Sequence, residues 1–214
     1  MIDTGIRHTH SEFGGRVVPA FSSIADSYGP DGCHWHGTHV AGTVGGSDVG
    51  VAKGVKLYSV RVLDCAGGGT TSGVIAGIDW ITANRVIPAV ANMSPDGSFS
   101  AAENDAIQRA IGAGVTLVVA AGNLGLDACQ WSPGSATNAV TVGASMINDQ
   151  MAMYSNSVSC VDLFAPGSNV YSASNTDDNA TTSASGTSMA RPQAAALYLL
   201  ANPSASPAEV ALLW

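Results

Sequence analysis

Short apolar runs alternate with segments of helical periodicity along this chain, and this alternation limits the possible folds more than any other feature. Val115–Ala121 is a continuous apolar run, typical of a strand buried on both faces of a sheet. Thr71–Asn84 instead repeats its apolar residues at helical spacing. The same reasoning predicts strands at Lys56–Leu63, Ala89–Met93, Ala139–Ala144 and Val161–Ala165, and a helix at Ala101–Ile111. The pattern predicts an α/β fold, a three-layer sandwich with a mostly parallel central sheet flanked by helices.

The composition allows a sizeable hydrophobic core and disfavours two classes of partner. The chain has 214 residues, of which 46% are hydrophobic and 11% charged, a length that suits one large domain or two small ones. The net charge is −8 and the 8 Lys and Arg residues are scattered, which disfavours nucleic acid as a partner. No uninterrupted apolar run approaches the ~20 residues that span a membrane, so we expect no membrane partner either.

The cysteines indicate a disulfide-bonded protein. There are four of them, namely Cys33, Cys65, Cys129 and Cys160, and none lies in a C-x-x-C pair. The spacing disfavours a zinc ribbon or a redox motif. An even number in an acidic, lysine-poor chain favours two disulfides and an oxidising compartment, with four buried free thiols as the alternative. Three pairings are possible.

Both ends of the chain lead us to expect truncation. Asp3-Thr4-Gly5 has the pattern of the last residues of a buried strand, yet only Met1-Ile2 precedes it, whereas a strand usually has about five residues. Near the other end, Pro207 occupies the first position of a predicted helix with a capping box, and Trp214 closes that helix without a C-cap.

Ser188 stands where a serine can serve as a nucleophile. The stretch Gly186-Thr187-Ser188-Met189-Ala190-Arg191-Pro192 places it between a glycine-bearing turn and an alanine-rich run, so its hydroxyl should project from the first turn of a helix. The free N–H groups and dipole at that point suit the negative charge that develops during acyl transfer. An exposed serine is a weak nucleophile alone, so this interpretation requires a base and a group that orients the base.

The histidines all lie early in the chain and include the candidate base. They are His8, His10, His34, His36 and His39. His36, at the start of a predicted helix, is the exposed candidate, whereas His39, one turn further in, is expected to be buried and hydrogen-bonded. A zinc site built from these imidazoles is the alternative, although neither a His-Glu-x-x-His motif nor a cysteine pair accompanies them.

Two polar residues at strand ends complete the candidate site. Asp3 ends the first strand and could orient the base, and Asn123 follows the apolar run and could donate its amide to a developing oxyanion. Each also has a simpler interpretation as a turn-forming residue.

Together these segments resemble the three signatures of subtilisin-like serine peptidases, in particular the bacterial extracellular members of the proteinase K group. The signatures are Asp3-Thr4-Gly5, His36–Gly42 and Gly186–Ala190, and they follow the order Asp, His, Ser that is known for subtilisin. Further matches across almost the whole chain are Gly50–Ala52, Val60–Asp64, Ala91–Ser94 and Phe164–Gly167.

The resemblance implies a serine endopeptidase in which residues 1–214 form one catalytic domain, incomplete at the N-terminus and at the C-terminus. Ser188 would be the nucleophile, His36 the general base and then acid, and Asp3 the group that fixes the imidazole tautomer. Asn123 and the Ser188 backbone N–H would form the oxyanion hole. An esterase would share this mechanism.

The resemblance also implies how substrate and ions bind. A peptide would add as a β-strand between two edges, and a pocket would receive the residue before the scissile bond. The edges map to Gly67, Gly68, Gly69, Ser94, Pro95 and Asp96, and the pocket wall maps to Ala121 and Gly122. Calcium would bind the Asp162 carboxylate and the carbonyls of Thr137 and Ala139, although Asp162 alone could be a surface turn acid.

Four further properties follow from the same resemblance. They are the disulfides Cys33–Cys65 and Cys129–Cys160, a propeptide before maturation, secretion, and a monomeric state.

Several positions depart from the family pattern. Trp35 replaces a glycine before the histidine, where it would strain the backbone or narrow the cleft. Pro95-Asp96 replaces Leu-Gly at a substrate edge, which removes an N–H and adds a charge. Arg191 replaces a threonine and could place a cation near Ser188. These changes support a second hypothesis, a subtilisin-like scaffold that binds peptides with impaired or no catalysis.

Overall fold

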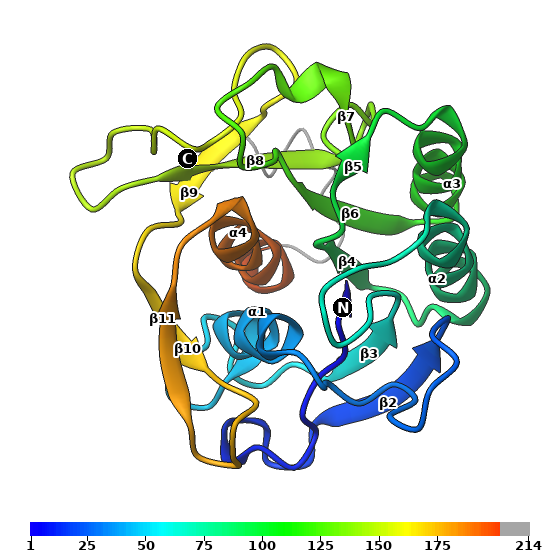
Figure 1. The fold of residues 1–214 in the computed structure, drawn as a ribbon, viewed down its shortest axis with the longest axis vertical. Helices are drawn as coiled ribbons and strands as arrows, with labels where there is room; N and C mark the ends of the chain where they lie inside the picture. Colours follow the sequence, from blue (N-terminus) through cyan, green and yellow to red (C-terminus); the bar gives the residue numbers. More distant parts are fainter. Residues whose placement is uncertain (202–214) are drawn as a thin grey trace.

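The central layer of the fold is a seven-stranded sheet in the order β2-β3-β1-β4-β6-β8-β9, shown in Figure 1. The computed structural model describes residues 1–201. Every neighbouring pair of strands in this sheet is parallel. The strands are β1 (Ile2–Asp3), β2 (Val17–Ser22), β3 (Leu57–Arg61), β4 (Ala89–Met93), β6 (Val115–Ala120), β8 (Val140–Ser145) and β9 (Leu163–Pro166).

Helices cover both faces of the sheet. Helices α2 (Thr71–Asn84) and α3 (Ala101–Gly112) pack on one face, and α1 (Trp35–Gly45) and α4 (Thr187–Ala201) lie on the other (Figure 1). Sheet and helices therefore form three layers, which confirms the predicted α/β sandwich. The helix predicted at Pro207 lies outside the described residues.

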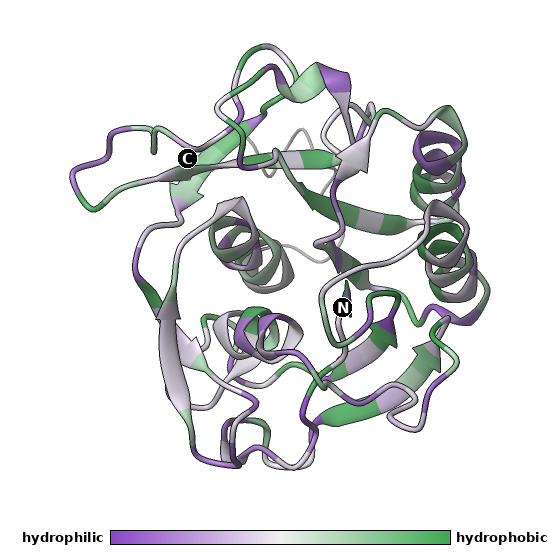
Figure 2. Ribbon diagram, viewed as in Figure 1, coloured by the Kyte–Doolittle hydropathy of each residue, from purple (hydrophilic) through white to green (hydrophobic). Residues whose placement is uncertain are grey.

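Two main hydrophobic clusters hold the layers together. On one face, Ile78 of α2 and Ile107 of α3 pack against strand residues such as Leu117. On the other, alanines of α4, including Ala190 and Ala194, lie against the sheet. All residues of β6 are buried, and the strand is hydrophobic along most of its length in Figure 2. The small alanine side chains of α4 allow this helix to approach the sheet closely.

Smaller elements surround this framework. Strand β5 (Gly97–Ser98) pairs with β7 (Trp131–Ser132), and β10 (Val170–Ala173) forms an antiparallel pair with β11 (Thr181–Ala184). The short 3-10 helices are η1 (Ser11–Phe13) and η2 (Ala128–Gln130).

Two disulfides cross-link loops of the structure. They join Cys33 to Cys65 and Cys129 to Cys160, with sequence separations of 32 and 31 residues. This is the pairing that the resemblance implies.

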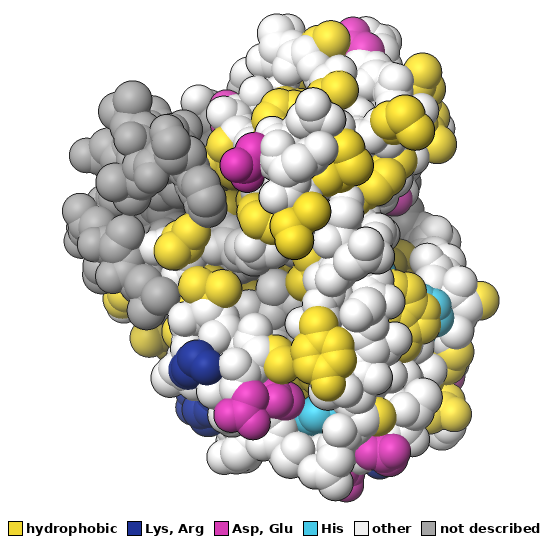
Figure 3. Space-filling view, turned by 90° about the vertical axis from the view of Figure 1, so that its left-hand side faces the viewer, with side chains coloured by type: hydrophobic (Ala, Val, Ile, Leu, Met, Phe, Trp, Pro, Cys, Tyr) yellow, Lys and Arg dark blue, Asp and Glu magenta, His cyan; other side chains and the backbone are white. Residues whose placement is uncertain are grey.

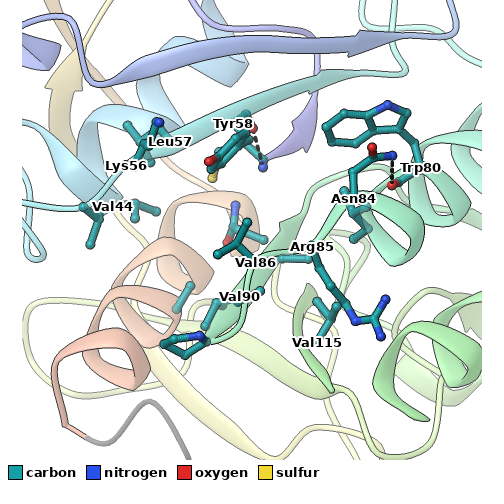
Figure 4. Close-up of a pocket in the computed structure, with 18 residues that line it drawn as sticks. Val44, Lys56, Leu57, Tyr58, Trp80, Asn84, Arg85, Val86, Val90 and Val115 are labelled. Atoms are coloured by element: carbon teal, nitrogen blue, oxygen red, sulfur yellow. Dashed lines mark hydrogen bonds between the residues drawn. The ribbon is translucent and has the colours of Figure 1, made fainter. Parts of the chain in front are cut away.

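An apolar cavity of about 380 Å³ lies at the amino ends of the strands. Figure 4 shows its lining, in which Leu57 and Tyr58 come from β3, Trp80 from α2 and Val90 from β4. Met1, directly before β1, also lines it. The cavity is therefore on the opposite edge of the sheet from the polar cleft described below.

Charged side chains cover little of the face that Figure 3 shows, where neutral and hydrophobic side chains dominate. Among residues 1–201, none of the helices combines the length and the hydrophobicity that crossing a bilayer requires.

Candidate active site

A polar cleft of about 770 Å³ opens at the carboxyl ends of the strands. Its wall includes Thr4 after β1, Ser94 after β4, and His36 and Ser188 from the first turns of α1 and α4. Later strands lie on both sides of β1, with β3 on one side and β4 on the other. Crevices of this kind, at the point where strand order reverses, are where parallel α/β sheets bind their ligands.

Asp3 is fully buried at the edge of this cleft. His36 Nδ1 lies 2.8 Å from Oδ1 and 3.1 Å from Oδ2 of its carboxylate, and the Thr4 N–H donates to Oδ1 at 2.7 Å. The Ser94 hydroxyl donates to Oδ2. Burial raises the pKa of Asp3, but the charge and hydrogen bond of His36, with the bonds from Ser94 and Thr4, hold this pKa well below its usual range. Asp3 is therefore an ionised acceptor.

A tight turn brings α1 against Asp3. Gly5 has φ +89°, and a Cβ there would lie 2.5 Å from the Asp31 carbonyl oxygen. Gly37 approaches the same turn so closely that a Cβ would lie 2.2 Å from the Gly5 oxygen. The Gly37 N–H donates to Thr4 Oγ1 at 2.9 Å. These contacts fix the start of α1, and with it the His36 ring.

The other histidines have separate partners. His39 is buried with Nε2 3.0 Å from the Val170 carbonyl oxygen, and burial is the main cause that lowers its pKa. His10 Nε2 lies 2.8 Å from the Ala180 oxygen, and His8 contacts Asp31. Within residues 1–201, the only cluster with metal-ligand geometry is Asp26 with the disulfide-bonded Cys33 and Cys65, so the histidines do not form the alternative zinc site.

Ser188 and Asn123 line the same cleft as His36. Asn123 Oδ1 accepts from the Thr187 N–H at 2.8 Å and from Thr187 Oγ1 at 3.1 Å. Because its oxygen is held by Thr187, the Asn123 amide NH₂ is left to donate elsewhere. No hydrogen bond joins Ser188 to His36 in the described part of the chain, and catalytic hydrogen bonds are often loose in unliganded sites.

Both predicted substrate edges line the cleft. Gly67, Gly68 and Gly69 belong to a loop in which the Asp64 carboxylate accepts from the Gly68 N–H at 2.9 Å. Ser94, Pro95 and Asp96 follow β4 and line the same cleft.

The predicted pocket wall, Ala121 and Gly122, is buried and not part of this cleft lining. Both carbonyls accept hydrogen bonds from Asn156, whose Oδ1 also accepts from the Leu124 and Leu126 N–H groups. Asn156 thus holds the segment around Asn123. Local sequence pattern gives no signal for Asn156, because its partners lie 30 or more positions earlier.

Arg191 is fully buried and lies behind the cleft rather than in it. Its Nε donates to Asn92 Oδ1 at 2.7 Å, another of its nitrogens donates to the Met93 carbonyl, and Nη2 donates to Ser94 Oγ at 2.5 Å. Burial lowers the pKa of Arg191 to about 10, against the opposing charges of Asp3 and Asp96, so it is a cation at neutral pH. The predicted cation near Ser188 is thus connected to Asp3 through Ser94.

Trp35 neither strains the backbone nor narrows the cleft. It is the first residue of α1, has no positive φ, and does not line the cleft. Its ring lies beside His34, His36 and His39, with centroids 5.4–5.8 Å away. The expected effect is absent because the indole is accommodated among these rings.

The proposed calcium ligands come from the segments that lead into the paired strands β8 and β9. The Thr141 N–H donates to Oδ2 of the exposed Asp162 at 2.7 Å, and Thr141 follows the segment that carries Thr137 and Ala139. Burial raises the pKa of Asp162 more than this hydrogen bond lowers it. Carboxylate and carbonyl oxygens are the ligand types that a hard cation prefers, although Gln108 also donates to the Thr137 carbonyl.

Comparisons with known proteins give a consistent result. The sequence profile of the Subtilase family matches residues 1–213. The extracellular serine proteinase of Thermus sp. (strain Rt41A) is 53% identical over 99% of this chain and 52% of its own length. Proteinase T of Parengyodontium album is 48% identical over 92% of the chain and 68% of its own length. The crystal structure of a cold adapted subtilisin-like serine proteinase matches with a TM-score of 0.91 and 49% identity, over 99% of this chain and 78% of the other. The chain spans about half the length of the first curated relatives that it matches.

Proposed function

Because the chain belongs to the subtilase family, we propose that it is a serine endopeptidase that hydrolyses peptide bonds in proteins through an acyl-enzyme intermediate. The observation that carries this proposal is the Asp3–His36 pair, with 2.8 Å between carboxylate and imidazole, in which His36 lines the same cleft as Ser188 and Asn123. Names of relatives such as extracellular serine proteinase support the same activity.

In the proposed reaction, Ser188 Oγ attacks the scissile carbonyl carbon while His36 Nε2 accepts the hydroxyl proton. Asp3 holds the Nδ1–H tautomer of His36 and stabilises the imidazolium. The tetrahedral oxyanion receives hydrogen bonds from the Asn123 NH₂ and the Ser188 N–H, and loss of one such donor typically costs ~10²–10³ in turnover.

The intermediate collapses as His36 returns the proton to the leaving amine, which gives the acyl-enzyme. Water, deprotonated by His36, then attacks the ester. The serine leaves with a proton and the acid product is released.

Labelling with a fluorophosphonate tests the proposal. We expect Ser188 to react, with the modified peptide identified by mass spectrometry, and Ser188→Ala to show no labelling. The same probe would label an esterase, so hydrolysis of an unmodified protein substrate is measured in parallel. Folded protein that does not label would support the second candidate, a peptide-binding scaffold with impaired catalysis, which is favoured by Pro95 and Asp96 at the proposed substrate edge.

Several further properties belong to this proposal. Asp162, Thr137 and Ala139 would bind a structural calcium ion. Secretion is supported by the two disulfides and by the names of extracellular relatives. We also propose maturation from a precursor with a propeptide, and a monomeric state.

A further inference from the structure

Glu103 is a buried carboxylate in the wall of the cleft that the proposed mechanism does not use. It lies in the first turn of α3, is 6% exposed, and its Oε1 has no hydrogen-bond partner among the described residues. A buried carboxylate oxygen without a partner is costly, so its presence in a cleft points to a missing ligand.

The local sequence predicts a hydrogen bond to the Glu103 carboxylate that the structure does not contain. Ser100-x-x-Glu103 has the capping-box pattern, in which the glutamate normally accepts from the N–H of the cap residue. Here the Ser100 N–H donates to Ser132 Oγ at 2.9 Å instead. The serine half of the box remains, since Ser100 Oγ accepts from the Glu103 N–H at 3.3 Å. The Glu103 carboxylate is therefore left free at the cleft.

The surrounding cleft contains a second carboxylate, and the basic residues in its lining are the histidines His34 and His36. Asp96 lines the same cleft, and the lining residues of the described chain include neither lysine nor arginine. Arg191, the nearby buried cation, is held by Asn92, Met93 and Ser94 behind the cleft. Asp96 belongs to a proposed substrate edge, so a peptide bound there would pass directly over these two carboxylates.

We propose that Glu103 and Asp96 form a subsite that selects a basic side chain of the peptide substrate, an arginine or lysine on the amino side of the scissile bond. The charged head would pair with Glu103 in the cleft wall and with Asp96 at its rim, and the methylene stem would lie against Val74 and Leu63, which line the same cleft. This inference rests on the proposed function and names its substrate class.

The protonation of Glu103 agrees with such a subsite. Burial, with a smaller effect of Asp96, raises the pKa of Glu103 from its ordinary value of 4.5 to about 7. An entering cation would favour the ionised form, so selection of a basic side chain should strengthen as the pH rises through 7. The other charged pair on these helices, Asp79 of α2 with Arg109 of α3, is exposed and satisfied.

Paired peptides that differ in one charge test the proposal. Ser188→Ala protein is titrated with fluorescent peptides that carry arginine, or its neutral isostere citrulline, at one position. That position is one of the three that precede the residue before the scissile bond. At pH 8 we expect arginine at one position to bind at least tenfold more tightly than citrulline. Adding Glu103→Gln should reduce the ratio of arginine-peptide affinity to citrulline-peptide affinity to near one. Adding Asp96→Asn should reduce this ratio partly.

Asp105→Asn provides the matched control. Asp105 is exposed on the same helix and does not line the cleft, so this variant removes one negative charge and should keep the arginine preference. Circular dichroism of each variant checks that it folds.

Equal binding of the two peptides at all three positions, or a preference that survives Glu103→Gln, would overturn the proposal. Fluorophosphonate labelling of the protein with Ser188 intact is read separately. Labelling without an arginine preference refutes the subsite alone, and a preference without labelling refutes the peptidase while the binding subsite stands.

Discussion

Arg191 connects the buried charges around the proposed active site. Its guanidinium bonds to Ser94, and Ser94 bonds to the Asp3 carboxylate, which in turn contacts His36. A planar fork can bind several acceptors in fixed directions, which a lysine ammonium cannot do. Arg191 is therefore a positioning residue, which acts on Asp3 through Ser94.

Replacing Arg191 should destabilise the fold. Arg191→Met leaves Asn92 Oδ1 and the Met93 carbonyl without their donor and removes a cation near buried Asp3, so we expect the free energy of unfolding to fall by about 3 kcal/mol. Arg191→Lys keeps the charge and should lose less. Urea denaturation of fluorophosphonate-inhibited protein measures both, and a loss below 1 kcal/mol in the methionine variant would contradict this account.

Glu103 should make stability depend on pH. Its folded pKa of about 7 lies above its ordinary value of 4.5. Between these values the folded state binds more protons than the unfolded state, so stability falls as pH rises from about 5 to 8. Glu103→Gln removes this titration and should gain relative to the parent by about 3 kcal/mol across that window. Urea denaturation at pH 5, 6, 7 and 8 measures this difference in the free energy of unfolding, with Asp105→Asn as the control. If the parent and Glu103→Gln show parallel dependence of that free energy on pH, the titration of Glu103 does not affect stability.

At the scale of elements, local pattern predicted the main framework well. The helix at Thr71–Asn84 and the strand at Ala89–Met93 have the predicted bounds, and the helix begins where Thr70 Oγ1 accepts from the Gly73 N–H. The strand predicted at Lys56–Leu63 is shorter, Leu57–Arg61. Its pairing with β1 ends at Asp3, whose carbonyl accepts from both the Val62 and the Leu63 N–H groups.

What local pattern missed depends on contacts between distant segments. The pairs β5–β7 and β10–β11 consist of short strands with polar residues, so periodicity gives no signal for them. Motifs placed Asp3, His36 and Ser188 as candidates. The free carboxylate of Glu103, in contrast, depends on Ser132 taking the Ser100 N–H, a contact 32 positions away that no helix-start motif reveals.

At the scale of the whole molecule, the two ends of the described chain meet around the site. Asp3 ends the first strand and Ser188 lies in the first turn of the last described helix, at the carboxyl edge of the parallel sheet. Arg7 reinforces this closure through Asp178, with 2.6 Å between Nε and Oδ1, and through the Asn175 carbonyl. Because the cleft lies at the carboxyl edge of the sheet, a ligand that stabilises the strands near one end of the sheet, such as β8 and β9, should also preserve the cleft.

The proposed calcium site lies between two such strands, since Asp162 precedes β9 and bonds to Thr141 of β8. A ligand that binds only the folded state at a hundred times its Kd adds about 2.7 kcal/mol of stability, or several degrees in Tm for a domain of this size. We expect calcium to raise the Tm of inhibited protein relative to EDTA, with little effect of magnesium. Asp162→Asn should lose this response while Asp105→Asn keeps it. An equal calcium response in Asp162→Asn would assign the ion to another site, because the carboxylate is the only charged ligand in the proposed set and its loss should remove most of the affinity.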